Sequence, residues 1–253
     1  MKILIITQNE SLFLPKALDY LLRRFPSYVN LVGCIIFDPS PYGKKKNIFS
    51  KVFSALSTFG FRFVFRYGSL ALWNIWKKRS ITQILSTHKV SMIKMHGNIN
   101  SDNSLDKINE LKPDLIISIA GNQIFRKKLI NIPSLGLLNL HSALLPKYRG
   151  LMPSFWVLKN NECQTGVSVF FVDEGIDSGP IIVQKKIKIH NISQFELIRM
   201  TKILGMDAIV ESVEKIHNGN YDLLLNDDQN STYFSFPTKD DIRDFRKSGG
   251  RFF

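Results

Sequence analysis

Apolar residues recur along the chain in two alternating patterns: short continuous runs, and stretches with helical spacing. Residues 3–6, 31–36 and 115–119 are almost entirely aliphatic, whereas residues 11–24 place leucine and alanine at helical spacing. Nearly continuous apolar strands are typical of a parallel sheet that is covered on both faces. The alternation of such strands with helices therefore predicts an α/β domain.

The whole chain can be divided into elements on this basis. The predicted strands are residues 2–7, 30–37, 90–94, 114–119, 135–140, 166–172 and 180–187. The predicted helices are residues 11–24, 81–87, 104–111 and 193–218. Ser193 with Glu196 three residues later is a start signal for the last helix, and Gly219 is a stop signal. We expect a mostly parallel twisted sheet with helices on both faces.

Residues 39–80 interrupt this pattern. They hold nine basic residues, no acidic residue and ten aromatic residues. Between residues 49 and 67 the apolar side chains largely share one helical face, which predicts an insertion helix. Three interpretations stay open: a helix packed on the sheet with a solvated basic back, a helix lying in a membrane surface, and a contact with phosphate or another polyanion.

Composition and charge narrow the class of protein. With 253 residues, 44% hydrophobic and 22% charged, the chain as a whole is neither disordered nor a coiled coil. Its net charge of +13 favours an anionic substrate or partner. Two cysteines are too few for a disulfide framework and indicate a reducing cytoplasm. Without a targeting signal or an apolar span of about 20 residues, we expect a cytoplasmic protein, with membrane association through 39–80 left open.

Three polar residues carry the candidate chemistry. Asn139 and His141 stand two apart near the end of a predicted strand, so their side chains should point to the same side. Ligand crevices form at strand ends in such sheets. Asp177 lies in a loop bounded by Gly175 and Gly179. Each residue alone has a structural explanation, but an imidazole, a carboxamide and a carboxylate brought together supply a base, an oxyanion donor and an orienting group.

The motifs around these residues resemble the 10-formyltetrahydrofolate-dependent formyltransferases. The features are Asn-x-His at 139–141, Leu-Pro-x-Tyr-Arg-Gly at 145–150, Thr-Gly-Val-Ser-Val at 165–169 and Asp-x-Gly-x-Asp-x-Gly-Pro-Ile at 173–181. That family includes methionyl-tRNA, glycinamide ribonucleotide and sugar N-formyltransferases. The resemblance is close over residues 112–190. It implies a Rossmann-like formyltransferase fold in which Asn139, His141 and Asp177 are catalytic.

The resemblance also implies an activity and a cofactor. A formyl group would pass from 10-formyltetrahydrofolate to a primary amine, with His141 as base and Asn139 as oxyanion donor while Asp177 holds the imidazole. The pteridine would lie against the backbone of Gln123, Ile124, Phe125, Val172, Asp173, Glu174 and Gly175. No metal is expected, since the five histidines show no ligand spacing. In many members a serine stands where this chain has Ala143, which puts one hydroxyl contact in doubt. Tyr148 and Arg149 either face the acceptor or serve in packing.

The acceptor is inferred from what surrounds the motif. We expect a catalytic domain at 1–218, with the insertion 39–80, and a C-terminal extension at 219–253. The 35 residues after 218 leave no room for a tRNA-binding domain, so nucleic acid is not expected as a partner. A nucleotide-linked amino sugar for surface-polysaccharide synthesis suits the positive charge best. Methionyl-tRNA, glycinamide ribonucleotide and a non-catalytic module that binds an anionic partner are the alternatives, and a homodimer stays open.

Overall fold

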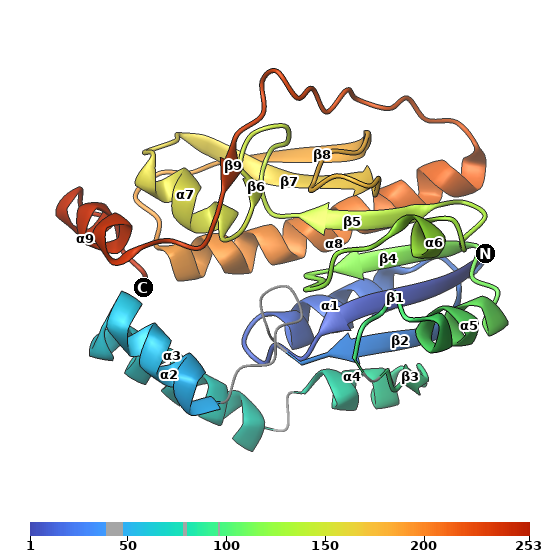
Figure 1. Cartoon of the computed structure of the whole chain (residues 1–253), viewed down its shortest axis with the longest axis horizontal. Coiled ribbons are helices and arrows are strands. Elements are labelled where there is room, and N and C mark those ends of the chain that lie inside the picture. Colours follow the sequence, from blue (N-terminus) through green and yellow to red (C-terminus); the bar gives the residue numbers. More distant parts are fainter. Residues whose placement is uncertain (39–47, 78–79, 96) are drawn as a thin grey trace.

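A seven-stranded sheet forms the centre of the molecule (Figure 1), in a computed structural model that describes residues 1–38, 48–77, 80–95 and 97–253. The strand order is β3-β2-β1-β4-β5-β7-β8. The strands are β1 (Lys2–Gln8), β2 (Asn30–Phe37), β3 (Met92–Ile93), β4 (Leu115–Ile119), β5 (Leu137–His141), β7 (Gln164–Phe171) and β8 (Ile181–Lys188). β1 to β5 pair in parallel, whereas β7 and β8 are antiparallel. The prediction of a mostly parallel sheet is confirmed.

Helices cover both faces because successive side chains of each strand point in opposite directions. Ile3 and Ile5 of β1 pack toward α1 (Leu14–Arg24), α4 (Ile81–Thr87) and α8 (Gln194–Asn218). Leu4 and Ile6 pack toward α5 (Asp102–Glu110) and α6 (Lys127–Ile130). α8 begins with the predicted capping box of Ser193 and Glu196 and ends at Gly219, which has a φ of 65°.

Several short elements differ from the prediction or were absent from it. α1 begins at Leu14 rather than at residue 11, because the Glu10 carboxylate accepts the backbone N–H groups of Phe13 and Leu14 at 2.9 and 3.0 Å. The third strand is only two residues long. The unpredicted elements are α6, α7 (Pro153–Lys159), α9 (Lys239–Lys247), β6 (Arg149–Gly150) and β9 (Tyr233–Phe234).

The insertion forms a helical hairpin, so the expectation of a single helix is wrong. α2 (Ile48–Phe59) and α3 (Phe61–Trp76) are separated by Gly60, whose φ of +84° breaks the helix. The two helices run side by side in opposite directions beside the C-terminal segment (Figure 1). The hairpin packs on that segment rather than on the sheet: the ring centroids of Phe63 and Phe252 lie 5.0 Å apart. Residues 39–47 of the insertion lie outside the described part of the chain.

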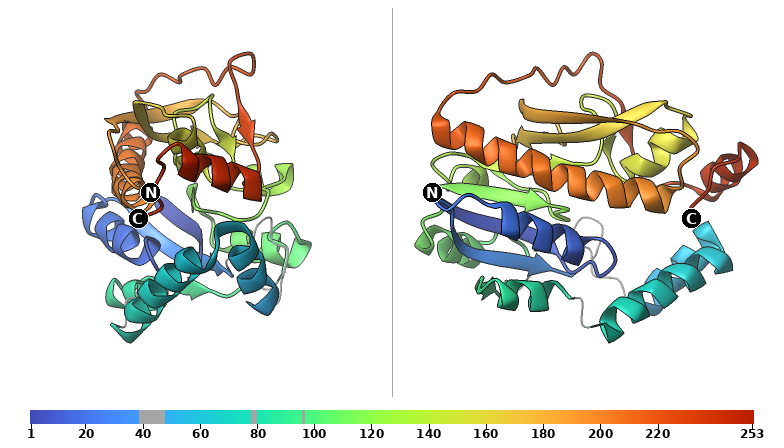
Figure 2. Two further views of the ribbon diagram at one scale, coloured as in Figure 1. Left: turned by 90° about the vertical axis from the view of Figure 1, so that its left-hand side faces the viewer. Right: turned by 180° about the vertical axis from the view of Figure 1, so that it is seen from behind.

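The segment after α8 runs back along the length of the molecule (Figure 2). It pairs β9 in parallel with β6, forms α9 and ends at Phe252 and Phe253. Phe245 of α9 is fully buried in a cluster that includes Phe155 of α7 and Phe252. Across the described ranges, no helix is both long enough and apolar enough to cross a bilayer.

Candidate active site

A cavity of about 770 Å³ lies at the carboxyl ends of β1, β4 and β5. Its wall is completed by residues 120–125 after β4, by residues 150–154 and by Thr201 and Lys202 of α8. Phe59, Phe63 and Tyr67 of the α2–α3 hairpin form a further part of the wall. The volume suits a small-molecule ligand, and the position is where ligands bind open α/β sheets.

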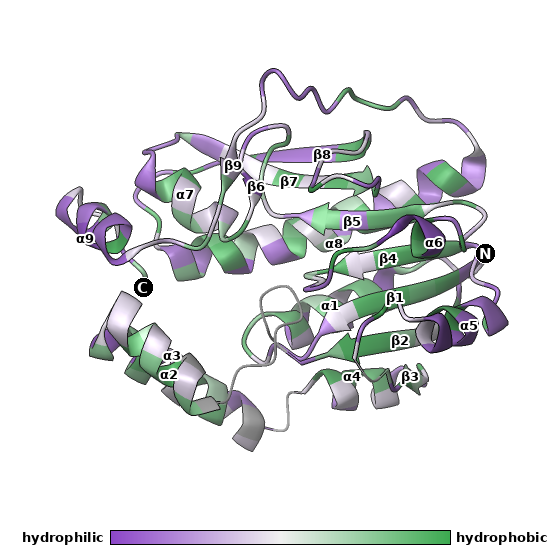
Figure 3. Cartoon of the chain, in the orientation of Figure 1, coloured by the Kyte–Doolittle hydropathy of each residue, from purple (hydrophilic) through white to green (hydrophobic). Residues whose placement is uncertain are grey.

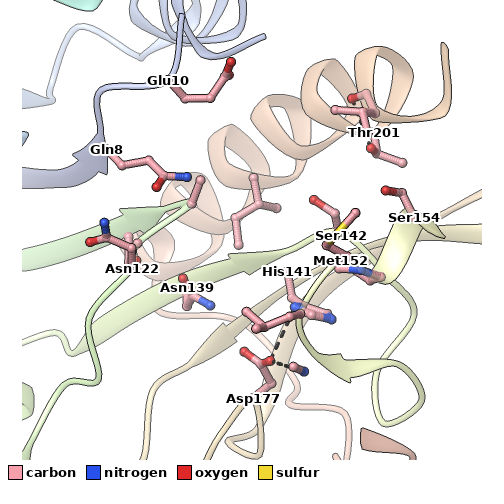
Figure 4. Close-up of a pocket in the computed structure, with 18 of the residues that line it drawn as sticks. Gln8, Glu10, Asn122, Asn139, His141, Ser142, Met152, Ser154, Asp177 and Thr201 are labelled. Atoms are coloured by element: carbon pink, nitrogen blue, oxygen red, sulfur yellow. Dashed lines mark hydrogen bonds and ion pairs between the residues drawn. The ribbon is translucent and has the colours of Figure 1, made fainter. Parts of the chain in front are cut away.

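Asn139 and His141 both line this cavity, as their spacing on β5 predicts. Figure 4 shows the two side chains on the same side of the strand, with Asp177 below the imidazole. Nδ1 of His141 lies 3.5 Å from Oδ2 of Asp177. His141 and Asp177, 36 positions apart in the sequence, therefore meet at the cavity. Among the described residues, no side chain forms a hydrogen bond with the Asn139 carboxamide, which can therefore bind a ligand oxygen.

A hydrogen bond at the second ring nitrogen of His141 determines which tautomer the neutral imidazole adopts. Nε2 lies 2.7 Å from the backbone oxygen of Tyr148. A carbonyl accepts hydrogen bonds but cannot donate them, so Nε2 must carry a proton. In the neutral ring, Nδ1 is then the basic nitrogen, and it faces the Asp177 carboxylate. The Tyr148 carbonyl orients the imidazole, and Asp177 is placed to stabilise the imidazolium that forms when Nδ1 takes a proton.

Asp177 is held by contacts on both its side chain and its backbone. Its Oδ2 accepts the backbone N–H of Gly150 at 2.9 Å. Its φ of 50° lies in the left-handed region, which is unusual for a residue other than glycine. The carboxamide of Asn226 stabilises this turn by donating to the backbone oxygens of Asp177 and Gly179, at 2.8 and 2.9 Å. The loop is therefore positioned by a residue of the C-terminal segment.

Arg149 and Tyr148 serve in packing, one of the two roles left open for them, and neither lines the cavity. The Arg149 guanidinium is buried and donates to Oδ1 of Asp228 at 2.6 Å and to Oδ1 of Asn226 at 2.9 Å. The Tyr148 hydroxyl donates to Oε1 of Glu162 at 2.6 Å. Burial and this carboxylate raise the pKa of Tyr148 to about 12. Asn226 was not among the residues singled out from the sequence, where it is one polar residue in a polar tail.

The residues expected to contact the pteridine are divided by the structure into two groups. Those that line the cavity are Gln123, Ile124, Phe125, Val172 and Gly175. Asp173 and Glu174 lie outside it. Oδ1 of Asp173 organises the loop by accepting from the Gly175 N–H at 3.0 Å and the Ser178 hydroxyl at 2.6 Å. Glu174 is exposed, with an ion pair to Lys127 at 3.6 Å.

The serine that many family members have at the position of Ala143 stands one position earlier here, as Ser142. Ala143 is fully buried, and its backbone oxygen accepts from the Ser168 hydroxyl at 2.8 Å. Ser142 lines the cavity instead (Figure 4). A hydroxyl is thus present on the cavity wall one position before the family's usual place.

Unused hydrogen-bonding groups gather around the cavity. Among the described residues, four buried side-chain polar atoms have no hydrogen-bond partner, and three of them belong to cavity-lining residues: Ser118 Oγ, Asn122 Oδ1 and Gln194 Oε1. Buried polar groups in native proteins are normally satisfied, so each of these three atoms is a candidate contact for a polar ligand or for ordered water. Ile124, Phe125 and Val172 add an apolar wall. A flat heterocycle with polar edges, such as a pteridine, fits this donor and acceptor set.

A lysine of α8 also contributes to the cavity wall. Lys202 of α8 lines the cavity, and in the described ranges no carboxylate forms an ion pair with it. Burial lowers its pKa, and the more distant Glu10 carboxylate acts in the opposite direction. Its sequence signal is weak, because Lys202 is one of several charged residues on an amphipathic helix.

Comparison with known proteins agrees with this geometry. The family model described as formyl transferase matches residues 76–211, which is more than half of the chain and includes Asn139, His141 and Asp177. The chain therefore belongs to the formyl transferase family, whose members are enzymes that use 10-formyltetrahydrofolate as formyl donor.

The sequence relatives and the structural neighbours include different members of this family. The methionyl-tRNA formyltransferase of Kosmotoga olearia is 37% identical over 144 residues, covering 56% of this chain and 46% of that protein. The chain spans about half the length of the curated relatives it matches. A sugar N-formyltransferase from a Shewanella species has the same fold, with a TM-score of 0.61 at 19% identity, covering 97% of this chain and 87% of that one. So has an N-formyltransferase from Helicobacter canadensis in complex with folinic acid and dTDP-3-aminofucose, with a TM-score of 0.60 at 19% identity over 93% and 71%.

Proposed function

We propose that this protein transfers a formyl group from 10-formyltetrahydrofolate to a primary amine. The observation that carries the proposal is the meeting of Asn139, His141 and Asp177 on one side of the cavity, with Nδ1 of His141 3.5 Å from Oδ2 of Asp177. These are the three groups that acyl transfer to an amine requires: an oxyanion donor, a base and a carboxylate that stabilises the protonated base.

Each residue has a defined part in this reaction. The donor supplies an electrophilic formyl carbon, and the acceptor amine forms the new C–N bond to it. The Asn139 carboxamide donates to the oxygen that becomes negatively charged. Nδ1 of His141 takes the proton that the amine loses, while the Tyr148 carbonyl holds Nε2–H. Asp177 stabilises the imidazolium, which then returns the proton to the leaving nitrogen as the old C–N bond breaks.

The acceptor that suits the site best is a nucleotide-linked amino sugar. The net charge of +13 and the cavity-lining Lys202 favour an anionic molecule. One structural neighbour was solved with dTDP and 5-N-formyl-THF and another with dTDP-3-aminofucose. Methionyl-tRNA is the second candidate, because the curated relatives at 34–41% identity include several methionyl-tRNA formyltransferases.

An acceptor panel tests the proposal. The protein is incubated with 10-formyltetrahydrofolate and, in separate reactions, nucleotide 3-amino and 4-amino sugars, glycinamide ribonucleotide and methionyl-tRNA. Mass spectrometry and the release of tetrahydrofolate measure the product. Formylation of one nucleotide sugar is the expected result. Product from methionyl-tRNA alone would transfer the acceptor assignment to that substrate, and binding of donor and acceptors without product in any reaction would contradict the enzymatic proposal.

Lys202→Met is expected to raise the KM for the anionic acceptor about tenfold or more, with a smaller change in kcat. A hydrogen bond to a charged group contributes about 1.5–3 kcal/mol, and about 1.4 kcal/mol corresponds to a factor of ten. Steady-state kinetics with varied acceptor measure the effect. Lys186→Met, at an exposed lysine of β8, is the matched control. An unchanged KM in the Lys202 variant would show that the acceptor's charge lies elsewhere.

A further inference from the structure

The α2–α3 hairpin presents apolar side chains on two opposite sides. On the inner side, Phe59 is buried, its ring stacks on Phe63 with centroids 4.4 Å apart, and both line the cavity. Tyr67 continues this side and packs on Phe253 at 5.0 Å. The Arg246 guanidinium donates to the backbone oxygen of Phe59 and so fixes the hairpin to α9. The inner side is therefore fully accounted for by the fold and the cavity.

On the outer side, large apolar side chains of the described residues stay exposed. Four of them, all on α3, are 65% to 70% exposed, and we call them the hairpin outer face: Phe61, Phe65, Leu72 and Trp76. At 3.6 residues per turn, the four on α3 fall within an arc of about 60°, roughly opposite to Phe63 and Tyr67. Exposed apolar residues scattered singly need no explanation, but a contiguous group of this kind marks an interaction surface.

The position of the hairpin makes this face accessible. Figure 2 shows the hairpin projecting beyond the edge of the sheet. Coloured by hydropathy, it is largely green and white, like the strands that the core buries (Figure 3). Neither α2 nor α3 is long and apolar enough to cross a bilayer. The geometry thus suits contact with a surface rather than insertion across one.

The charge around the hairpin outer face selects the partner. Residues 39–80 contain nine basic residues and no acidic one. Arg62 is exposed beside Phe61 on α3, and Nζ of Lys77 lies 5.1 and 5.0 Å from the ring centroids of Trp73 and Trp76. A second copy of the same hairpin would be repelled by this charge. A polynucleotide would satisfy the cations but would leave leucine and phenylalanine side chains in water.

We propose that the hairpin outer face docks on an anionic lipid surface. Its phenylalanine, leucine and tryptophan side chains enter the headgroup and upper acyl region, and Arg62 and Lys77 beside them contact lipid phosphates. Basic residues combined with exposed aromatic and aliphatic side chains are what interfacial helices require. Because the other side of the same hairpin lines the cavity, docking places the cavity wall next to the lipid surface. This inference does not depend on formyl transfer.

Vesicle binding tests the proposal with one probe and one matched pair of variants. The protein is sedimented with vesicles of phosphatidylcholine alone and of phosphatidylcholine with phosphatidylglycerol, at low and at high salt. We expect binding only to the anionic vesicles, weakened at high salt because salt screens exposed charges. Leu72→Glu should lower the apparent affinity about tenfold. Leu225→Glu, the same change at a leucine 83% exposed but outside the hairpin, should leave it unchanged.

Tryptophan fluorescence gives an independent readout. Trp156 is buried, with 7% exposure, whereas Trp73 and Trp76 on the hairpin are 54% and 68% exposed. A blue shift on adding anionic vesicles therefore reports the hairpin. Absence of pelleting with phosphatidylglycerol at low salt, equal weakening by the two leucine variants, or binding of single-stranded RNA in preference to vesicles would overturn the proposal. So would a dimer in sedimentation velocity that Leu72→Glu dissociates.

Discussion

Replacement of His141 by glutamine is expected to lower turnover about 10²–10⁴-fold, the contribution typical of a positioned general base. A glutamine amide can still donate to the Tyr148 backbone oxygen, which His141 Nε2 contacts at 2.7 Å. It has no basic nitrogen to face Asp177. The fold should persist, so circular dichroism and the thermal midpoint should match those of the unmodified protein while kcat with the best acceptor falls.

Asp177→Asn is the companion variant in this experiment. It keeps an oxygen that can accept the Gly150 N–H but removes the negative charge that faces Nδ1. We expect a large loss of turnover here too, and a double variant that is little worse than either single one, because residues that act as a unit are not additive. Turnover near the unmodified rate in either single variant would refute the assigned mechanism.

Phe245→Ala is expected to lower the free energy of unfolding by about 3–5 kcal/mol, the usual effect of truncating a buried phenylalanine. Phe245 is fully buried, and its ring centroid lies 5.1 Å from those of Phe155 and Phe252. The substitution leaves a hole where α7, α9 and the chain end meet. Urea unfolding followed by circular dichroism measures the change, seen as a lower midpoint at an unchanged m-value.

The control for this variant is Phe53→Ala on α2, where the ring is 75% exposed. Removing an exposed ring should change the free energy of unfolding by about 0.5 kcal/mol or less. If Phe245→Ala caused a loss as small as that, residues 239–253 would not be part of the cooperative core. A large loss would show that the segment expected as a C-terminal extension unfolds together with the sheet.

The sheet could be predicted because its strands are buried on both faces and therefore appear as continuous apolar runs. Residues 3–6 are all fully buried. Ile3 and Ile5 belong to one core cluster, and Leu4 and Ile6 belong to the cluster on the other face of the sheet. The meeting of Asn139 with His141 followed from their spacing on one strand. Thr238 and Asp241, three residues apart in the sequence, form a capping box at the start of α9.

Other features depend on contacts that no local pattern contains. The orientation of His141 is set by a backbone carbonyl, which every residue possesses. Arg149 is tied to Asn226, 77 residues away, and no spacing in the sequence links the two. Gly60 separates α2 from α3. The helical spacing of apolar residues continues across Gly60, so the sequence pattern alone predicts one helix. Distant and backbone-mediated contacts account for these differences.

The Asp177 carboxylate, which we propose is catalytic, depends for its position on a residue of the C-terminal segment. Asn226 holds the backbone of Asp177, yet it lies outside residues 76–211, the part that the family model matches. A chimaera that exchanged only the matched part would carry all three proposed catalytic side chains but would lose the contact that holds the loop of Asp177. A design that transfers this site to another scaffold must therefore include residues 226–228 as well.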